Sequence, residues 1–164
     1  MIELPVWVLF LAIVVVIAVI AGVLASAAAQ RLNRMHVRCD LARASLEAAL
    51  GRRAAVARAA YPELGQLVQS AESQPLTAAD PGLRADAENR LTAAIEDIAP
   101  ERTDELSPAV VRELNEARVR VDLARRFYNE AVTDTRALRR RPMVKYFRLA
   151  GTAPRPQYFD AAAR

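Results

Sequence analysis

The feature that most constrains this chain is an uncharged, apolar stretch from Leu4 to Gln30. Most of its 27 residues are valine, isoleucine, leucine or alanine. About 20 consecutive apolar residues in a helix are enough to cross the ~30 Å hydrocarbon core of a bilayer. The stretch therefore predicts a single transmembrane helix, and residues 1–30 are expected to form a membrane anchor.

The charges that flank this stretch predict its orientation. Only Glu3 precedes it, whereas Arg31, Arg34, Arg38 and Arg43 follow it closely. Basic residues next to a transmembrane helix are retained on the cytoplasmic side. We therefore expect a single-pass protein of the cell membrane, with its N-terminus outside and its C-terminal domain in the cytoplasm.

A cleaved signal peptide is the alternative interpretation of the same stretch, with Ala25-Ser26-Ala27 as its cleavage site. A signal peptide has a basic n-region and an apolar run of about 7–15 residues. This chain has neither, so a retained anchor is favoured.

The anchor also carries three small residues spaced four apart, Ala18, Gly22 and Ser26. They form a small-xxx-small ridge that allows close helix–helix packing in lipid. Alanine-rich sequences produce such ridges by chance as well. A homo-oligomer is therefore one expected state and a monomer the other.

Composition predicts an all-α fold and argues against catalysis. Alanine is abundant, with five glycines and 5% aromatic residues, which suits packed helices better than sheets. The single Cys39 leaves no internal disulfide, and the single His36 leaves no pair of histidines for catalysis. Neither has the spacing of metal ligands. We expect no catalytic residue, no metal site and no cofactor.

Helical periodicity continues beyond the anchor. Small or apolar side chains recur every three or four positions between residues 30 and 61, with Arg53 as the one interruption, so the membrane helix is predicted to continue as one rod. Pro62 is expected to kink this first cytoplasmic helix, which then resumes. In the alternative, residues 62–74 turn back as a separate helix. The apolar positions of the rod are Leu32, Met35, Cys39, Ala42, Leu46, Ala49, Val56 and Ala60.

Two further helices are predicted after a break at residues 74–79. The second helix begins at Asp80-Pro81, an N-cap followed by a proline in the first turn, and is expected to end at Pro100. It is predicted to bury Leu83, Ala87, Leu91, Ala94, Ile95 and Ile98. The third helix repeats this start signal at Ser107-Pro108 and runs to about Arg141. Its apolar seam consists of Leu114, Ala117, Val121, Ala124, Tyr128, Ala131, Thr135 and Leu138.

The predicted fold class is therefore all-α. A single N-terminal transmembrane helix continues into an antiparallel bundle of three to four long helices. The bundle is expected to occupy residues 31–142, and a basic tail residues 143–164.

The positive charge of the chain lies at its C-terminal end. Residues 136–164 hold eight basic side chains and one acid, whereas the other residues hold 15 basic and 18 acidic ones. Arg139, Arg140 and Arg141 compensate the dipole at the end of the third helix and are candidate partner-binding residues. If the first helix runs away from the membrane, the second back toward it and the third away again, this end lies roughly 50 Å from the membrane. If residues 62–74 turn back as a separate helix, the directions of the later helices reverse and this end lies at the lipid headgroups. The sequence leaves both arrangements open.

Two adjacent aromatic residues, Tyr158 and Phe159, are predicted to anchor the tail. Neighbours in an extended segment point to opposite sides. One ring is expected in a groove between the first and third helices, near the end of the third, and the other partly exposed for a partner. Arg148 and Arg155 would then approach the acidic stretch of the second and third helices. Asn129, one position off the seam, is expected to bridge helices or to contact a partner.

The third helix and the tail resemble a known family. Residues 124–134, Ala-Arg-Arg-Phe-Tyr-Asn-Glu-Ala-Val-Thr-Asp, are similar to the LemA signature, in which an Ala-Arg pair precedes Tyr-Asn-x-Ala-Val. The family then has a proline, a glycine nine residues on and a Tyr-Phe-acid ending, matched by Pro142, Gly151 and Tyr158-Phe159-Asp160. The resemblance implies a membrane-anchored antiparallel helical bundle that faces the cytoplasm. It does not imply an enzyme.

These features together predict a non-enzymatic, membrane-anchored scaffold or adaptor of the LemA type, which binds other proteins through its bundle and tail. The alternative is a protein that binds or organises envelope lipids through its basic C-terminal segment. An enzyme that uses carboxylate chemistry is least favoured. The expected partners are the membrane and unidentified proteins, with no nucleic acid.

Overall fold

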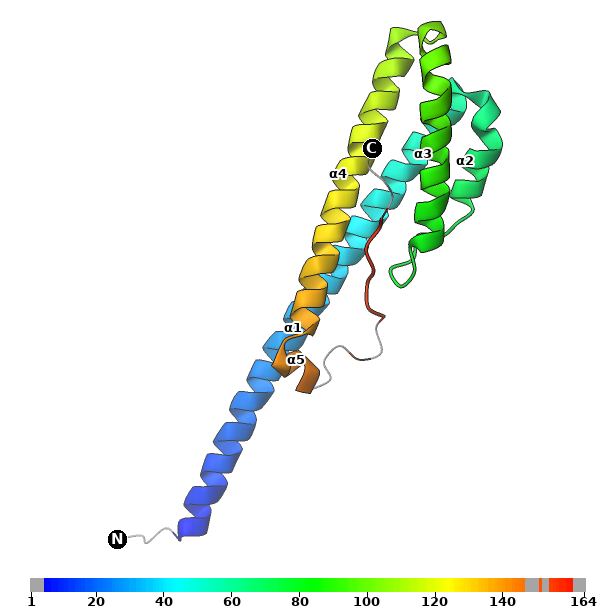
Figure 1. Cartoon of the computed structure of the whole chain (residues 1–164). Coiled ribbons are helices and arrows are strands. Elements are labelled where there is room, and N and C mark those ends of the chain that lie inside the picture. Colours follow the sequence, from blue (N-terminus) through cyan, green and yellow to red (C-terminus); the bar gives the residue numbers. More distant parts are fainter. Residues whose placement is uncertain (1–4, 147–150, 152–153, 161–164) are drawn as a thin grey trace.

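The computed structural model describes residues 5–146, 151 and 154–160. Within these ranges the chain is helical and contains no strand. The helices are α1 (Val6–Ala60), α2 (Gly65–Glu72), α3 (Gly82–Arg102), α4 (Pro108–Arg139) and α5 (Pro142–Tyr146), with 3₁₀ turns at Pro62–Leu64 and Thr103–Glu105. The predicted fold class, a long apolar N-terminal helix that continues into a helical bundle, is confirmed (Figure 1).

α1 is one unbroken helix of 55 residues, about 80 Å long at 1.5 Å per residue. Its N-terminal half extends beyond the bundle as a bare rod (Figure 1). Among the described residues α1 alone is long and apolar enough to cross a membrane, and none of its most apolar 18-residue window is buried inside the protein. The predicted continuity of this helix across residue 30 is confirmed.

α4 packs antiparallel along the C-terminal half of α1, and these two helices form the central pair. The predicted seam of α4 is buried from Ala117 to Leu138, and only its first member, Leu114, is partly exposed. Ser107 caps α4 by accepting a hydrogen bond from the Val110 amide at 3.4 Å. The seam packs against a matching stripe on α1 that includes Leu46 and Leu50.

Two ion pairs fix the direction of α4 relative to α1. Arg38 contacts Asp134 at 3.1 Å, and Arg52 contacts Glu113 at 2.8 Å. As the chain proceeds along α4, it therefore returns toward the part of α1 that follows the apolar rod. α5 then packs beside α1 through Val144.

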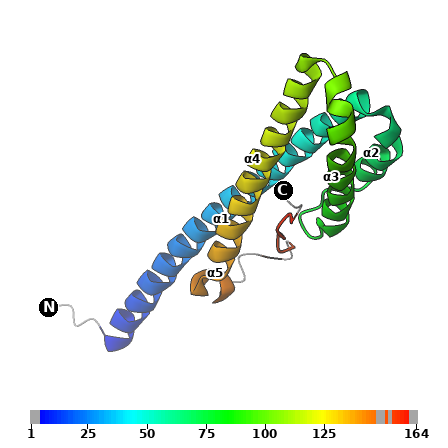
Figure 2. The same cartoon turned by 45° about the horizontal axis from the view of Figure 1, so that its top comes forward.

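α2 turns back along α1 instead of resuming its direction, so the alternative of a separate helix is the correct one. Tyr61 leaves the helical region at φ −132°, and Pro62 begins a 3₁₀ turn. The apolar face of α2, including Val68, then packs on Ala57. α1 thus runs away from its apolar half, α2 runs back toward it, α3 runs away again and α4 returns. α2 and α3 lie together on one side of the α1–α4 pair (Figures 1 and 2).

α3 differs from its prediction in its buried face and its ends. Leu83 is 66% exposed, whereas Arg84 and Glu88 are buried. Pro100 lies inside the last turn and α3 continues to Arg102, because so close to the C-terminal end the missing N–H and the ring of the proline disturb only that last turn. α3 also begins one residue late, at Gly82. α4 ends at Arg139, two residues before its predicted end.

Candidate functional site

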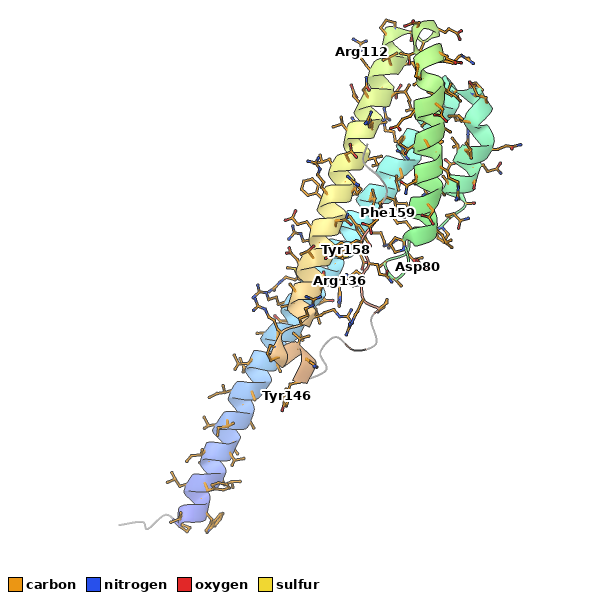
Figure 3. All side chains as sticks on the ribbon, viewed as in Figure 1. Asp80, Arg112, Arg136, Tyr146, Tyr158 and Phe159 are labelled. Carbon is orange, nitrogen blue, oxygen red and sulfur yellow. The ribbon has the colours of Figure 1, made fainter. Side chains whose placement is uncertain are left out.

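The C-terminal strap, residues 154–160, lies in an extended conformation against α4 (Figure 3). Side chains of α4 form hydrogen bonds with the backbone of the strap at four of its residues. Tyr128 Oη donates to the Gln157 carbonyl at 2.9 Å, and Asn129 pairs with both backbone groups of Phe159 at 2.9 and 3.1 Å. The remaining two bonds run from Arg136 Nε to the Pro156 carbonyl and from Arg139 Nη1 to the Pro154 carbonyl, each at 2.8 Å.

The two aromatic residues of the strap divide as the sequence predicts. Phe159 is fully buried in the core, among residues that include Leu76 and Tyr128. Tyr158 is 37% exposed. Its ring lies 4.7 Å from the Arg136 guanidinium carbon, a cation–π contact. The strap is thus part of the fold, and its aromatic residues are its anchor.

Two details of the docking prediction are wrong. Phe159 pairs with Asn129, well before the end of α4, and its pocket includes Leu76 from the α2–α3 loop as well as α1 and α4. Arg155 instead lies near Arg139, at the basic C-terminal end of α4, and contributes to lowering its pKa. Arg148 lies outside the described residues.

Asn129 uses its side chain to bridge α4 and the strap. Burial raises the pKa of the neighbouring Tyr128 hydroxyl to about 12, so this hydroxyl stays protonated and donates to the strap. Burial also raises the pKa of the Cys39 thiol, which keeps it protonated and unreactive. Tyr128 and Asn129 thus hold the strap against α4, and Cys39 is part of the core.

Basic side chains from the start and the end of the bundle gather where α1 leaves its apolar half. We call this set the basic collar: Arg31, Arg34, Arg139, Arg140, Arg141 and Lys145. A small cavity of about 220 Å³ has both Arg31 and Arg141 in its wall. Leu32, Leu138 and Val144 pack together in the same region. The structure therefore has the second of the two predicted arrangements, in which the basic end of α4 lies beside the apolar half of α1.

Burial is the main cause that lowers the pKa of Arg139, with Arg155 as a second cause. Burial and Arg139 also lower the pKa of His36 on α1, against the opposing effect of Asp40. Arg140, Arg141 and Lys145 stay exposed. The collar consequently offers a set of solvent-facing positive charges at one level of the rod.

The small residues of the anchor lie on the bare half of α1. Ala18, Gly22 and Ser26 are all exposed, and a Cβ placed on Gly22 would meet no neighbouring atom within 4 Å. The described structure thus leaves this ridge open along the rod.

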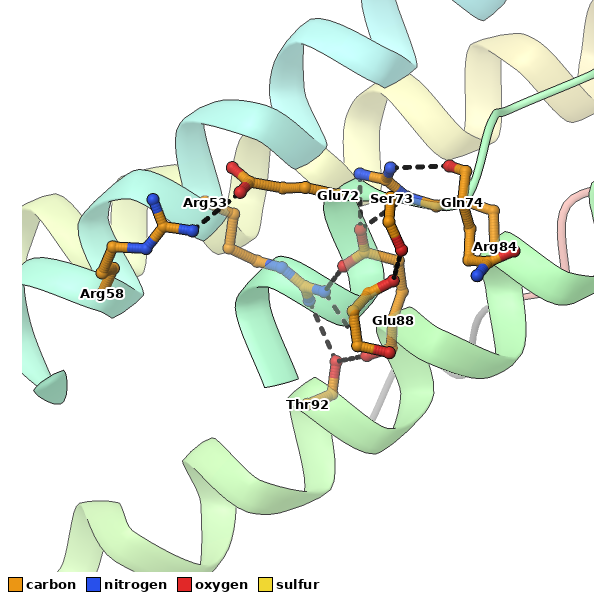
Figure 4. A network of polar contacts seen from close by, with 9 residues as sticks. Arg53, Arg58, Glu72, Ser73, Gln74, Arg84, Glu88 and Thr92 are labelled. Atoms are coloured by element: carbon orange, nitrogen blue, oxygen red, sulfur yellow. Dashed lines mark hydrogen bonds and ion pairs between the residues drawn. The ribbon is translucent and has the colours of Figure 1, made fainter. Parts of the chain in front are cut away.

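An ionic cluster, which sequence reasoning missed, joins α1 to α3 (Figure 4). Glu88 is 1% exposed and binds Arg53 from α1 and Arg84, one turn earlier on α3, the latter at 2.9 Å. Arg84 also donates to the Gln74 carbonyl at 2.9 Å, and Arg53 to Thr92 at 3.0 Å. Arg53 interrupts the predicted apolar stripe of α1, and this interruption was the available signal.

A cleft of about 300 Å³ opens between α3 and α4 at the end of the bundle far from the apolar rod, and we call it the distal cleft. Its apolar residues include Leu50, Ile95, Leu114 and Val121. Its charged residues are Arg53, Glu96, Arg118, Asp122 and Arg125. In the part of the chain that the structure describes, no three His, Cys, Asp or Glu residues gather as metal ligands.

Over the described residues, the fold and these sites define an all-α protein with one helix able to cross a membrane and a bundle that the strap holds together beside it. Comparison with protein-family models, with curated proteins and with solved structures finds no match.

Proposed function

We propose that this protein is a non-enzymatic, membrane-anchored scaffold or adaptor of the LemA type, which binds protein partners through its bundle. The distal cleft is the observation that carries this proposal. Its volume of about 300 Å³ and its apolar lining between charged residues suit a few apolar side chains of a partner segment, since binding sites combine apolar lining with a few polar groups. The unbroken α1 would hold this cleft at a fixed distance from the bilayer.

The same proposal includes a cell-membrane location, with the N-terminus outside and the bundle in the cytoplasm. The arginines that follow the apolar half of α1 support this orientation. An impermeant reagent that reacts with Arg141→Cys in intact cells, in a Cys39→Ala background, would contradict it.

Site-specific photo-cross-linking in native membranes tests the adaptor proposal. A photoreactive amino acid at Asn115, an exposed residue of the cleft, should give discrete protein adducts. Asp86, exposed on α3 and outside the cleft, is the control position. Equal adduct patterns from the two positions, or no adduct from Asn115, would refute the cleft as a partner site.

A second candidate function is the binding of anionic lipid headgroups, and the basic collar favours it. Each basic side chain near an anionic bilayer contributes about 1 kcal/mol, within a Debye length of ~10 Å. Arg140, Arg141 and Lys145 are exposed beside Arg31, which directly follows the apolar half of α1. The collar therefore stands where headgroups would be if that half spans the bilayer.

Hydrogen exchange in lipid nanodiscs separates this candidate from the first. Amides of residues 140–146 should exchange more slowly in anionic than in neutral lipid, and added salt should remove the difference. Replacing Arg140 and Arg141 by glutamine should remove it as well, whereas replacing the distal, exposed Arg90 and Arg112 should not. Identical exchange in both lipids would rule out headgroup binding by the collar.

A further inference from the structure

The two sides of the α1–α4 pair differ in what covers them. α2, α3 and the strap all lie on one side (Figures 1 and 2). Away from that side, five large apolar side chains of the pair are at least half exposed. We call these residues the open face: Val37, Leu41, Val119, Leu123 and Phe127, with exposed fractions of 50, 67, 63, 51 and 53%.

Spacing and ion pairs place these side chains together. Val119, Leu123 and Phe127 recur every four residues along α4, and Val37 and Leu41 do so along α1, so each set forms one stripe. Arg38 pairs with Glu130 at 3.7 Å across the two helices. Leu41 follows Arg38 by three residues and Phe127 precedes Glu130 by three. Leu41 and Phe127 therefore stand at the same height on the same side of the pair.

Several of the charges around the open face are paired within one copy. Arg38 contacts Glu130 and Asp134, Arg52 contacts Glu113, and Arg120 contacts Glu116. Two such faces can approach each other without bringing a block of like charge together. Large exposed apolar patches on a folded protein usually mark an interaction site.

Anchoring in a bilayer favours a second copy of this chain as the partner that covers the open face. Copies anchored by the same N-terminal helix stand parallel, so each presents its open face at the same height as its neighbour. A twofold axis normal to the membrane then makes the contact self-complementary. Anchoring also raises the effective concentration and removes part of the entropy lost on association.

The apolar half of α1 supports the same contact between two copies. Residues eleven apart in an α-helix complete about three turns, and Val37 lies eleven residues after Ser26 in an unbroken helix. The side of α1 that bears Ser26 therefore continues into the side that bears Val37, whereas Gly22 lies about 60° away around the helix. Ser26 and Val37 can face the same neighbouring helix.

We infer that the open face is the contact between two parallel copies of this chain in the membrane, with Leu41 and Phe127 at its centre. The inference rests on the proposed membrane anchoring of α1, and it does not use the distal cleft or the basic collar.

Cysteine cross-linking of the full chain in membranes tests the contact directly. In a Cys39→Ala background, Val37→Cys and Leu41→Cys should form disulfide-linked dimers on mild oxidation. Ser70→Cys, exposed on α2 on the covered side, is the control and should not. Dimers from Ser70→Cys in equal yield would overturn the inference.

A matched pair of charge substitutions tests the energetics by single-molecule photobleaching in liposomes. Phe127→Glu should raise the lipid-scaled dissociation constant at least tenfold, because it places like charges across the twofold axis. Leu83→Glu, which alters an apolar residue of α3 that is 66% exposed, should change it less than twofold. Unchanged circular dichroism melting would show that both variants fold.

Three results would each overturn the inference. The wild-type chain could remain monomeric at every density, Phe127→Glu could dimerise as well as the wild type, or Leu83→Glu could weaken the dimer equally. A dimer abolished by Gly22→Leu but unaffected by Phe127→Glu would be held by the membrane helix alone and would also refute it.

Discussion

The covered and open sides of the α1–α4 pair contain the same kinds of residue in different surroundings. Phe159 on the covered side is fully buried, whereas Phe127 on the open side is 53% exposed. Glu88 on the covered side is 1% exposed and lies between two arginines, whereas the ion pairs of the open side are solvated. Burial, and not residue type, therefore decides which contacts hold the fold.

This difference indicates how stability and association are divided over the molecule. The covered side is locked by apolar packing, by the ionic cluster and by four points of contact between α4 and the strap. The open side contributes little to the fold of one copy, so its apolar residues remain available for binding. Substitutions on the two sides should therefore affect different measurements.

The largest expected effect is that of Glu88→Ala on the covered side. Two buried guanidiniums would lose their carboxylate, and breaking a buried ion pair typically costs about 3–5 kcal/mol. Glu72→Ala is the matched control because Glu72 pairs with Arg58 at 2.8 Å on the surface, where such pairs contribute about 0–1 kcal/mol. Urea unfolding of the full chain in nanodiscs, followed by circular dichroism, measures both. Equal losses would mean that burial of the cluster adds nothing.

The two phenylalanines give the next prediction. Phe159→Ala should destabilise the chain by about 3 kcal/mol, the low end of the range for a core phenylalanine, because the end of the strap can move to fill the space. Phe127→Ala should change stability by no more than about 0.5 kcal/mol. The same urea titration compares them. If Phe127→Ala proves as damaging as Phe159→Ala, the open side is part of the core and the comparison fails.

Much of this architecture could be predicted from local pattern. The seam of α4 follows from regular steps of three and four, and Ser107-Pro108 marks its start. The tail could be predicted to dock because Tyr158 and Phe159 stand out in a polar, proline-rich segment. Periodicity and cap signals are encoded within a few residues, so one sequence suffices to recognise them.

The remaining features depend on contacts between distant residues. The ionic cluster joins Arg53 to Glu88, which periodicity did not predict. Periodicity also favoured Leu83 as one of the buried residues of α3, although it is exposed. The parity of the helices depends on α2 turning back after Tyr61, because a proline signals a break without its direction. That one turn decides whether the basic end of α4 lies beside the apolar half of α1 or far from it.

Asn129 should show a smaller effect on the covered side. Asn129→Ala removes a side chain that satisfies both backbone groups of Phe159 at 2.9 and 3.1 Å. Leaving buried polar groups unpaired costs about 1–3 kcal/mol. Asn115→Ala, at an exposed position of the same helix, should be nearly neutral. Hydrogen exchange at Phe159 is the sharper measurement, and an unchanged rate in Asn129→Ala would show that the strap is held without this bridge.

The smallest expected effect is a pH dependence of stability that arises from His36, which lies near Arg139. Burial and the positive charge of Arg139 lower the pKa of His36 below its ordinary value of 6.5, although Asp40 opposes them. The unfolded chain therefore binds the proton more readily than the folded one, so stability is full above about pH 6.5 and falls as the pH drops below it.

Urea unfolding between pH 5.5 and 7.5 should show this slope, because His36 is the single histidine of the chain and most carboxylates titrate at lower pH. His36→Gln keeps a polar side chain without a titrating ring, and its stability should stay level over the same interval. Arg139→Gln, which leaves His36 in place, should reduce the slope by removing the like charge but not abolish it, since burial is the larger cause. A slope that persists in His36→Gln would assign the pH dependence to another group.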